Sequence, residues 1–506
     1  MSILNSTSKK TGILLSYCHL AIQTISTMVL TSVFVRMLGV DEYGFYQMIY
    51  SVANYILILD LGISATMVRF ISEYRALGDR KREENFAAHM MIIIGIILVV
   101  VVCVGSIVNH NLGNMYSSLS SSDLSRAHAI FATMIFQIVI TIISHYIQGI
   151  ALSYERFSAV KIGNIFQVFL YFVSSIILVT VSSTSMSIVK ANTLAISGAT
   201  VLLLIYDISS IKFKIKWHGA DWKMLFPAFT LMIAMLLQSI ISYVNTSLDK
   251  TLLGIYTLKS DVAVYSIAAT IITLYNAMPS AISGVFLPHV TRAVVSGADN
   301  TELTECVIRA GRYQYIICGA ILGGFIAFGR DFISLWTGEH TSDAWIYALL
   351  IMIPNTIPLV QNVCLSILDA KNKRIFRSLI LCGIVLSNIA LSIFLIRRFG
   401  PIGAPLATGF CYFLGHGLVM NIYYQKKIGL QITRIFKTIL PRTTIVMLVD
   451  STICILIKSV VSCSNWYGFV INGVIFCVLY GITVFSFVLN KDEKQEIIGL
   501  IKRRGR

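Results

Sequence analysis

The chain consists of long, continuous apolar runs separated by short polar segments. Because these runs do not alternate between polar and apolar residues, they predict membrane-spanning helices and not strands. A helix needs about 20 mostly apolar residues to cross the hydrocarbon core. The pattern predicts an all-α polytopic membrane protein whose transmembrane segments, about 14 of them by this criterion, lie at residues 12–38, 43–70, 86–108, 127–153, 160–183, 187–207, 225–248, 261–288, 313–336, 344–369, 377–396, 402–424, 440–461 and 466–489.

The composition supports this assignment. Of the 506 residues, 56% are hydrophobic and 13% are charged, against about 25% charged in an ordinary soluble domain. So few polar side chains cannot cover a water-soluble surface, which argues against a soluble enzyme, a nucleic-acid binder or a disordered scaffold. The ten cysteines form no CxxC pair, so we expect neither a disulfide framework nor a metal site. We also expect no cofactor.

The net charge of +16 is explained by where the basic residues lie. If the amino terminus is cytoplasmic, most of the 40 lysines and arginines fall on the cytoplasmic side of the predicted segments. A basic rim of this kind faces anionic lipid, so nucleic acid is not needed as a partner. We therefore expect a multi-pass membrane protein with both termini cytoplasmic.

An internal repeat relates the first and seventh predicted segments. Residues 23–39, QTISTMVLTSVFVRMLG, align without a gap with residues 238–254, QSIISYVNTSLDKTLLG. An even number of segments lies between the two copies, so they have the same orientation, as in transporters with parallel repeats. The repeat predicts a six-helix bundle at 1–210, a second six-helix bundle at 211–430, and two accessory helices with a basic tail at 431–506.

Polar residues recur at helical spacing in both copies of the repeat. The stripe consists of Gln238, Ser242, Asn245 and Asp249 in the second copy and of His19, Gln23 and Thr27 in the first. Such a stripe either faces a water-filled cavity or joins helices through hydrogen bonds. Because it occurs in both copies, the cavity is the favoured interpretation, and Gln23, Gln238 and Asn245 become candidate substrate-binding residues.

Two carboxylates are predicted to lie within the hydrocarbon, Asp60 and Asp450. Charge at this depth is costly unless it is paired, hydrated or protonated. Asp60, together with Asp249, is a candidate ion-coupling residue, and its expected partners across the first hairpin are His19, Gln23 and Thr24. The alternative is that Asp60 is a structural hydrogen-bonding group. Asp450 is expected to pair within the accessory helices.

Cationic residues near the ends of segments are candidates for an anionic substrate. Arg36 and Lys250 lie near the outer ends of the first and seventh segments, where they could bind a pyrophosphate through charge-assisted hydrogen bonds. The alternative is that they reach the outer headgroups. Arg309 and Arg312, at the cytoplasmic start of the ninth segment, could receive the same ligand, although positive-inside placement also explains them.

The chain carries no HExxH, GxSxG, GxxxxGK[ST] or strand-linked GxGxxG motif, so we predict that it is not an enzyme and has no ATPase of its own. Asp41 and Glu42 lie where polyprenyl-linked glycosyltransferases carry acidic residues, but a polar hairpin turn is the favoured interpretation. The mixed segments 69–85, 289–312 and 491–506 are expected to be either interfacial helices or solvated connectors.

Three stretches resemble a known family. VRMLGVDEYGFYQMIYSV and LDLGISATMVRFISEYRALGDRKREEN resemble the amino-terminal region of Wzx-type O-antigen flippases, and FGPIGAPLATGFCYF at 399–413 resembles their GxxGAxxAT turn. The resemblance reaches the superfamily that also includes multidrug exporters and the lipid II flippase. It implies two six-helix bundles arranged as in those exporters around a central cavity.

The resemblance also implies a function. The expected substrate is an undecaprenyl-pyrophosphate-linked oligosaccharide. It is expected to be moved from the cytoplasmic to the periplasmic leaflet of a bacterial inner membrane, with ion coupling. A polysaccharide polymerase and a chain-length regulator are the implied protein partners. The alternatives are a small-molecule exporter of the same fold and, third, a polymerase or glycosyltransferase.

Overall fold

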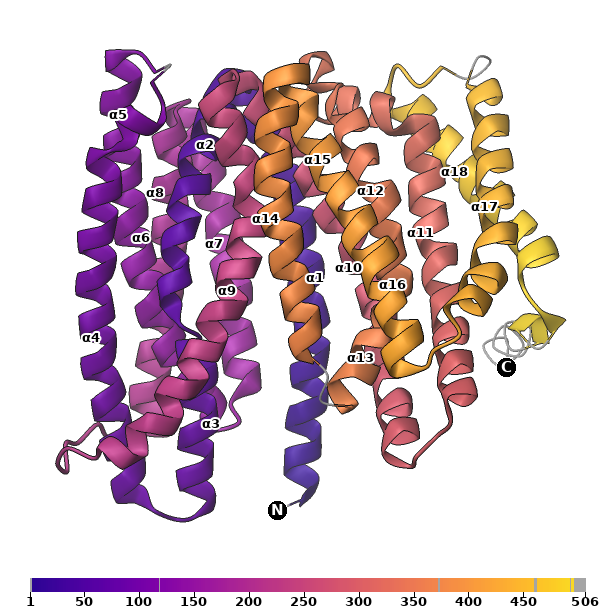
Figure 1. The fold of residues 1–506 in the computed structure, drawn as a ribbon. Coiled ribbons are helices and arrows are strands. Elements are labelled where there is room, and N and C mark those ends of the chain that lie inside the picture. Colours follow the sequence, from indigo (N-terminus) through magenta and orange to yellow (C-terminus); the bar gives the residue numbers. More distant parts are fainter. Residues whose placement is uncertain (1, 118, 372–373, 459–461, 492, 496–506) are drawn as a thin grey trace. The chain divides into compact units, whose positions relative to one another are not determined.

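The computed structural model describes residues 2–117, 119–371, 374–458, 462–491 and 493–495 (Figure 1). Within these residues every regular element is a helix, which confirms the predicted class. The chain separates into two compact units, residues 1–263 and 264–506. The predicted bundle boundaries at 210 and 430 rest on the sequence repeat and stay a prediction.

Unit 1 is built from long apolar helices joined by short turns. Its elements are α1 (Ser2–Leu38), α2 (Val40–Ile56), the 3-10 helix η1 (Leu57–Asp60), α3 (Ile63–Ala76), α4 (Arg80–His110), α5 (Leu112–Met115), α6 (Ser121–Ser153), α7 (Phe157–Val181), α8 (Ser185–Tyr206), the π-helix η2 (Asp207–Ile211), α9 (Trp222–Tyr256) and the start of α10 (Lys259–Val295). In this unit α1 packs on α7, α3 on α6, α6 on α8 and α2 on α9. Helix α9 corresponds to the seventh predicted segment, which begins the second copy of the repeat. It is nevertheless part of the first compact unit.

Unit 2 continues α10 and adds the remaining helices. They are α11 (Asn300–Thr337), η3 (Glu339–Thr341), α12 (Ala344–Val360), α13 (Asn362–Ala370), α14 (Arg374–Phe399), η4 (Gly400–Ile402), α15 (Gly403–Tyr412), η5 (Phe413–Val419), α16 (Met420–Tyr423), η6 (Tyr424–Ile428), α17 (Ile432–Ile457), α18 (Trp466–Thr483) and η7 (Val484–Val488). The two accessory helices, α17 and α18, pack on α11. Asp450 of α17 accepts a hydrogen bond of 2.6 Å from the Thr483 hydroxyl of α18, which confirms the predicted pairing within these helices.

The helices are long and apolar enough to form a multi-pass membrane protein. Thirteen ranges of the described chain meet this condition, and one of them, Phe376–Ile428, is 53 residues long. That range contains two packed helical stretches, α14 and the run from α15 to η6, separated by a turn at Gly400, which has φ 69°. Counted in this way, the helices agree with the fourteen predicted segments.

The mixed segments 69–85 and 289–312 are not separate interfacial helices. Each extends two long helices to a tight corner, at residues 77–79 and 296–299. Both corners contain a glycine of positive φ, Gly78 and Gly297, followed by a capping aspartate. Asp79 accepts from the Arg82 amide at 3.0 Å, and Asp299 accepts from the Glu302 amide at 2.7 Å. Most of the segment 491–506 lies outside the described residues.

Candidate functional site

The second membrane span is broken near its middle. Val40–Ala76 forms one candidate span, but α2 ends at Ile56, and a single 3-10 turn carries the chain to Asp60. Leu61 and Gly62 then adopt left-handed backbone with φ of 54° and 65° before α3 begins. A left-handed conformation is unusual for leucine. Breaks of this kind inside membrane spans are tolerated where the backbone lies within protein or beside a water-filled space.

Asp60 ends the 3-10 turn and bonds to α6. His145 Nδ1 donates to Asp60 Oδ1 at 2.9 Å, and both side chains are part-buried, with 35% and 19% of their surfaces exposed. The expected partners His19, Gln23 and Thr24 are thus replaced by a histidine of another helix. The physical reason is the break itself, because the left-handed residues after Asp60 turn the chain there and the carboxylate reaches α6.

Polar side chains also line the contact between α2 and α9. The buried hydroxyls of Ser51 and Thr251 lie 2.9 Å apart, and the Tyr55 hydroxyl lies 3.3 Å from Thr251. Asn54 Nδ2 donates to Ser247 Oγ at 3.4 Å. We call these side chains, with the pair formed by Gln47 and Lys250, the α2–α9 polar seam.

Lys250 occupies one end of the seam. Its ammonium donates to Gln47 Oε1 at 3.0 Å, and Gln47 in turn donates to the Tyr43 hydroxyl at 2.8 Å. These partners are neutral, so the hydrogen bonds orient the lysine without cancelling its charge. A cation held in this way within a membrane helix is a functional candidate by default.

The polar seam and Asp60 form one line along unit 1. Gln47 and Asp60 are 13 positions apart, which corresponds to about 20 Å at the rise of a helix. The 3-10 turn that contains Asp60 packs against α9, and Gly62 allows this approach. A Cβ at Gly62 would lie 2.7 Å from Cβ of Met235 in α9. Unit 1 therefore carries a line of polar groups from Lys250 to the middle of the second span.

The other predicted residues on α1 and α9 differ in their exposure. Gln23 and Gln238 are exposed, Asn245 is half-buried, and Asp249 is buried with 3% exposure. Arg36 is exposed in the last turn of α1. The predicted stripe is thus exposed over most of its length and buried at its Asp249 end.

The two arginines at the start of α11 belong to unit 2. Arg309 is exposed, whereas Arg312 is 9% exposed. The guanidinium of Arg312 donates to the Val488 carbonyl at 2.7 Å and pairs with Glu493 at 3.0 Å. Arg312 therefore joins α11 to the segment after α18, and its predicted role in substrate binding stays a prediction.

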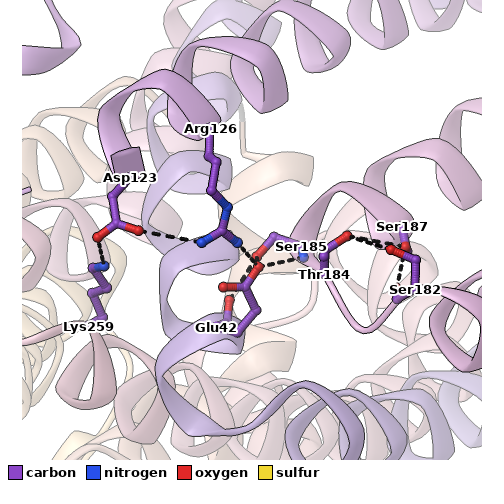
Figure 2. Close-up of polar contacts among 8 residues, drawn as sticks. All are labelled: Glu42, Asp123, Arg126, Ser182, Thr184, Ser185, Ser187 and Lys259. Atoms are coloured by element: carbon purple, nitrogen blue, oxygen red, sulfur yellow. Dashed lines mark hydrogen bonds and ion pairs between the residues drawn. The ribbon is translucent and has the colours of Figure 1, made fainter. Parts of the chain in front are cut away.

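A second polar cluster lies at the opposite end of unit 1 from the α3–α4 corner (Figure 2). Glu42 accepts from the Ser185 amide and hydroxyl, both at 2.8 Å, and pairs with Arg126. Arg126 also pairs with Asp123 at 3.4 Å, and Asp123 pairs with Lys259 at 2.5 Å. Glu42 thus ties α2 to α6 and α8, which is a structural role and agrees with the favoured interpretation of a polar turn.

The chain is similar to known proteins in its sequence and in its fold. The sequence profile of a family described as polysaccharide biosynthesis protein matches residues 9–294, more than half of the chain. The chain belongs to the polysaccharide biosynthesis protein family. Among curated proteins, none matches the sequence significantly.

Solved structures with a fold similar to that of this chain include membrane transporters. The lipid II flippase MurJ in an inward closed conformation has a TM-score of 0.72 at 15% identity, covering 93% of this chain and 98% of that one. An inward-facing multidrug resistance MATE family transporter of the MOP superfamily has a TM-score of 0.68 at 12% identity, with 82% and 96% covered. A point mutant of the MATE transporter VcmN of Vibrio cholerae has a TM-score of 0.57 at 12% identity, with 85% and 99% covered. At these identities the likeness establishes the fold of this polysaccharide biosynthesis protein.

Several site residues could not be identified from the sequence. His145, Gln47, Ser51 and Asn54 lie in apolar or mixed runs with no distinguishing motif. Asp207, at the end of α8, is 5% exposed, and neither of its carboxylate oxygens has a hydrogen bond within the described residues.

Proposed function

We propose that this protein is a flippase. It moves undecaprenyl-pyrophosphate-linked O-antigen repeat units from the cytoplasmic to the periplasmic leaflet of the bacterial inner membrane by alternating access. Both termini lie in the cytoplasm, and an ion gradient drives the cycle. The family membership and the transporter fold support this proposal, and the polar line of unit 1 is the observation that carries it.

Lys250 is proposed to bind the pyrophosphate. Its partner Gln47, which donates in turn to Tyr43, is neutral and leaves the charge of Lys250 available to a phosphate oxygen. An ammonium is a suitable phosphate ligand as a point charge. Arg36, in the last turn of the neighbouring copy of the repeat, is proposed to add a second cation. Arg309 and Arg312 are proposed to receive the substrate at the cytoplasmic side.

Gln23, Gln238 and Asn245 are proposed to line the path of the oligosaccharide. Gln23 and Gln238 are exposed although they lie within membrane spans. Exposed amides are unfavourable against lipid, which supports a water-filled path beside them. Amides also suit the hydroxyl groups of a sugar, since they both donate and accept hydrogen bonds.

Asp60 is proposed to couple transport to ions through its pair with His145, and Asp249 is proposed to assist it. An Asp–His pair in the middle of a span is typical of proton relays in transporters. Its position beside a helix break supports a conformational role, because discontinuous helices contribute ion sites in many transporters. A polymerase and a chain-length regulator are proposed to act after this step.

The deciding experiment is a gene deletion in the host, complemented with wild-type protein or with variants. Lipid-linked sugars would be extracted, and the cytoplasmic-face and periplasmic-face pools separated by their accessibility. Intermediates trapped on the cytoplasmic face, with surface polysaccharide lost, would support the flippase. Single unpolymerised units at the surface would indicate a polymerase, and two unchanged pools would favour an exporter of small molecules.

Complementation with Lys250→Met tests the proposed pyrophosphate ligand. The variant is expected to trap intermediates as the deletion does, at wild-type abundance in the membrane. Lys190→Met is the matched control, because Lys190 is another lysine within a span but lies in α8 and is not one of the residues of the polar seam. Equal export by the two variants would remove Lys250 from the proposed site.

A further inference from the structure

The linker between α8 and α9 lies against the amino-terminal end of α4. In Figure 1 this linker and the α3–α4 corner lie at the bottom of the view. The Asn85 side chain donates to the Gly219 carbonyl at 3.1 Å and accepts from the His218 amide at 2.9 Å. His218 Nε2 pairs with Glu84 at 3.0 Å, and the Trp217 ring stacks on His89. The linker is therefore fixed to unit 1.

A pocket of about 340 Å³ lies where the linker meets the α3–α4 corner and the end of α6. Its charged lining consists of four cations and two carboxylates: Arg75, Arg80, Lys212, Lys214, Glu83 and Glu84. This volume is at the lower end of the range of ligand pockets, about 300–1,000 Å³. It suits a small polar group and is too small for an oligosaccharide.

The two carboxylates are already engaged by other groups. Glu83 accepts a hydrogen bond from the Tyr154 hydroxyl. Burial and the Glu83 carboxylate both raise the pKa of the Tyr154 phenol, so the hydroxyl stays protonated and keeps donating. Glu84 pairs with His218 and, at 3.3 Å, with Arg80. With four cations against two carboxylates, the lining of the pocket keeps a net positive charge.

Arg75 is oriented by neutral partners. It donates to the Ser153 carbonyl at 2.5 Å, and its guanidinium lies 3.9 Å from the centre of the Tyr154 ring. Lys212 and Lys214 are exposed at the pocket rim, and within the described residues no ion pair involves either lysine or Arg75. Three cations from two segments thus surround one small polar pocket and retain their charge.

We propose that this pocket binds the phosphate of an anionic ligand at the cytoplasmic membrane surface, the headgroup of an anionic phospholipid. Arg75 offers fixed donors, and the two lysines supply mobile ammonium groups from the linker. The position of the pocket at the ends of α3 and α6 matches the depth of headgroups, where basic residues attract anionic lipid. The bound phosphate bridges the linker to the α3–α4 corner. This site is separate from the α2–α9 polar seam; its cytoplasmic side rests on the proposed orientation, whereas its binding of phosphate does not depend on the proposed transport.

The test uses the full-length protein in detergent, titrated with phosphatidylglycerol and followed by native mass spectrometry. The pocket variant is Lys212→Gln/Lys214→Gln. The control variant is Lys216→Gln/Lys223→Gln, which removes the same charge from exposed lysines outside the pocket. Because each pocket lysine makes a charge-assisted hydrogen bond as well as contributing surface charge, we expect the pocket variant to lose at least about tenfold more affinity than the control.

The result separates three cases. Equal losses in the two variants would mean that only general surface charge attracts the lipid, and the proposal would be overturned. A larger loss in the pocket variant supports the site, and a competition arm then identifies the ligand. If millimolar inorganic phosphate displaces the lipid, the pocket recognises a free phosphate; if it does not, the phospholipid headgroup is the ligand. Unchanged thermal midpoints in both variants would exclude unfolding as the cause.

Discussion

His145 of α6 donates a hydrogen bond to Asp60 at the break of the second span, with 2.9 Å between Nδ1 and Oδ1. The two residues are 85 positions apart and lie on different helices. A part-buried pair of this kind holds a carboxylate within the membrane at a lower cost than an isolated charge. If it couples transport to ions, the two residues act as one unit.

We expect Asp60→Asn to abolish transport while leaving membrane abundance intact, because the amide cannot carry the negative charge. His145→Asn should reduce transport at least tenfold, about 1.4 kcal/mol or more, and the double variant should be no worse than Asp60→Asn alone. Accessibility of lipid-linked sugars in complemented deletion cells measures this. His128→Asn is the control, since His128 lies near the start of α6 and bonds to Asn109 of α4 instead of to Asp60. Normal transport by Asp60→Asn would leave the pair with a structural role only.

Gly44 allows the start of α10 to approach α2. A Cβ at Gly44 would lie 1.8 Å from the Lys259 carbonyl oxygen, so Gly44→Ala should destabilise unit 1 by about 1–3 kcal/mol or more, as other overpacking changes do. Gly95→Ala in α4 is the control, because nothing lies within 4 Å of its added Cβ. The control should leave stability unchanged or slightly raised, since alanine favours helix. Thermal midpoints of the two purified variants would decide, and equal midpoints would contradict the close approach.

Glu42 is expected to contribute to stability through its bonds to Ser185 and Arg126. Glu42→Gln removes the charge and should lower stability by about 1.5–3 kcal/mol, the range for hydrogen bonds to charged groups. The adjacent carboxylate of Asp41 is exposed and makes no hydrogen bond within the described residues, so Asp41→Asn should have little effect. Urea or thermal unfolding in detergent compares the two. A loss of similar size in both would mean that net charge, and not the cluster in Figure 2, is responsible.

The hydroxyl pair of Ser51 and Thr251 joins α2 to α9, and it can be measured by a double-mutant cycle. Each alanine variant removes this bond while the remaining hydroxyl keeps a backbone carbonyl of its own helix as partner, so each should cost about 0.5–1.5 kcal/mol. The double variant should be less destabilising than the sum of the two, with a coupling of about 0.5–1.5 kcal/mol. Thr246→Ala in place of Thr251→Ala is the control, because Thr246 is exposed and bonds only within its own helix. Additive losses for Ser51 and Thr251 would contradict the seam.

Much of the fold could be predicted because a membrane helix needs a long apolar run, and such runs are visible in the sequence. The turn residues also carry information: glycine followed closely by aspartate is a typical turn and capping signal, and Gly78 with Asp79 and Gly297 with Asp299 form capped corners. The break at residues 57–62 was not predicted, because a short 3-10 turn in an apolar stretch has no distinct periodicity. His145 could not be recognised either, since its role arises only when α6 lies beside Asp60.

The repeat also shows where sequence similarity misleads. Gly39 and Gly254 are aligned, yet they serve different needs. Gly39 has φ 87° between α1 and α2, with open space around it, whereas Gly254 lies inside α9. A Cβ at Gly254 would lie 2.5 Å from the Met48 side chain. One glycine is needed for its backbone conformation and the other for its small size.

The linker between α8 and α9 is attached to α4, so the sequence repeat and the compact folding unit end at different places in the chain. The repeat boundary lies in the linker, whereas the compact unit continues past it. A cut within residues 212–221 would follow the repeat, but it would detach α9 from the unit whose core it completes. Two fragments made there would have to reassemble across the α2–α9 polar seam before either could function. A split version of this protein should therefore assemble more readily when its first fragment ends after α9, at residues 257–258, than when it ends in the linker.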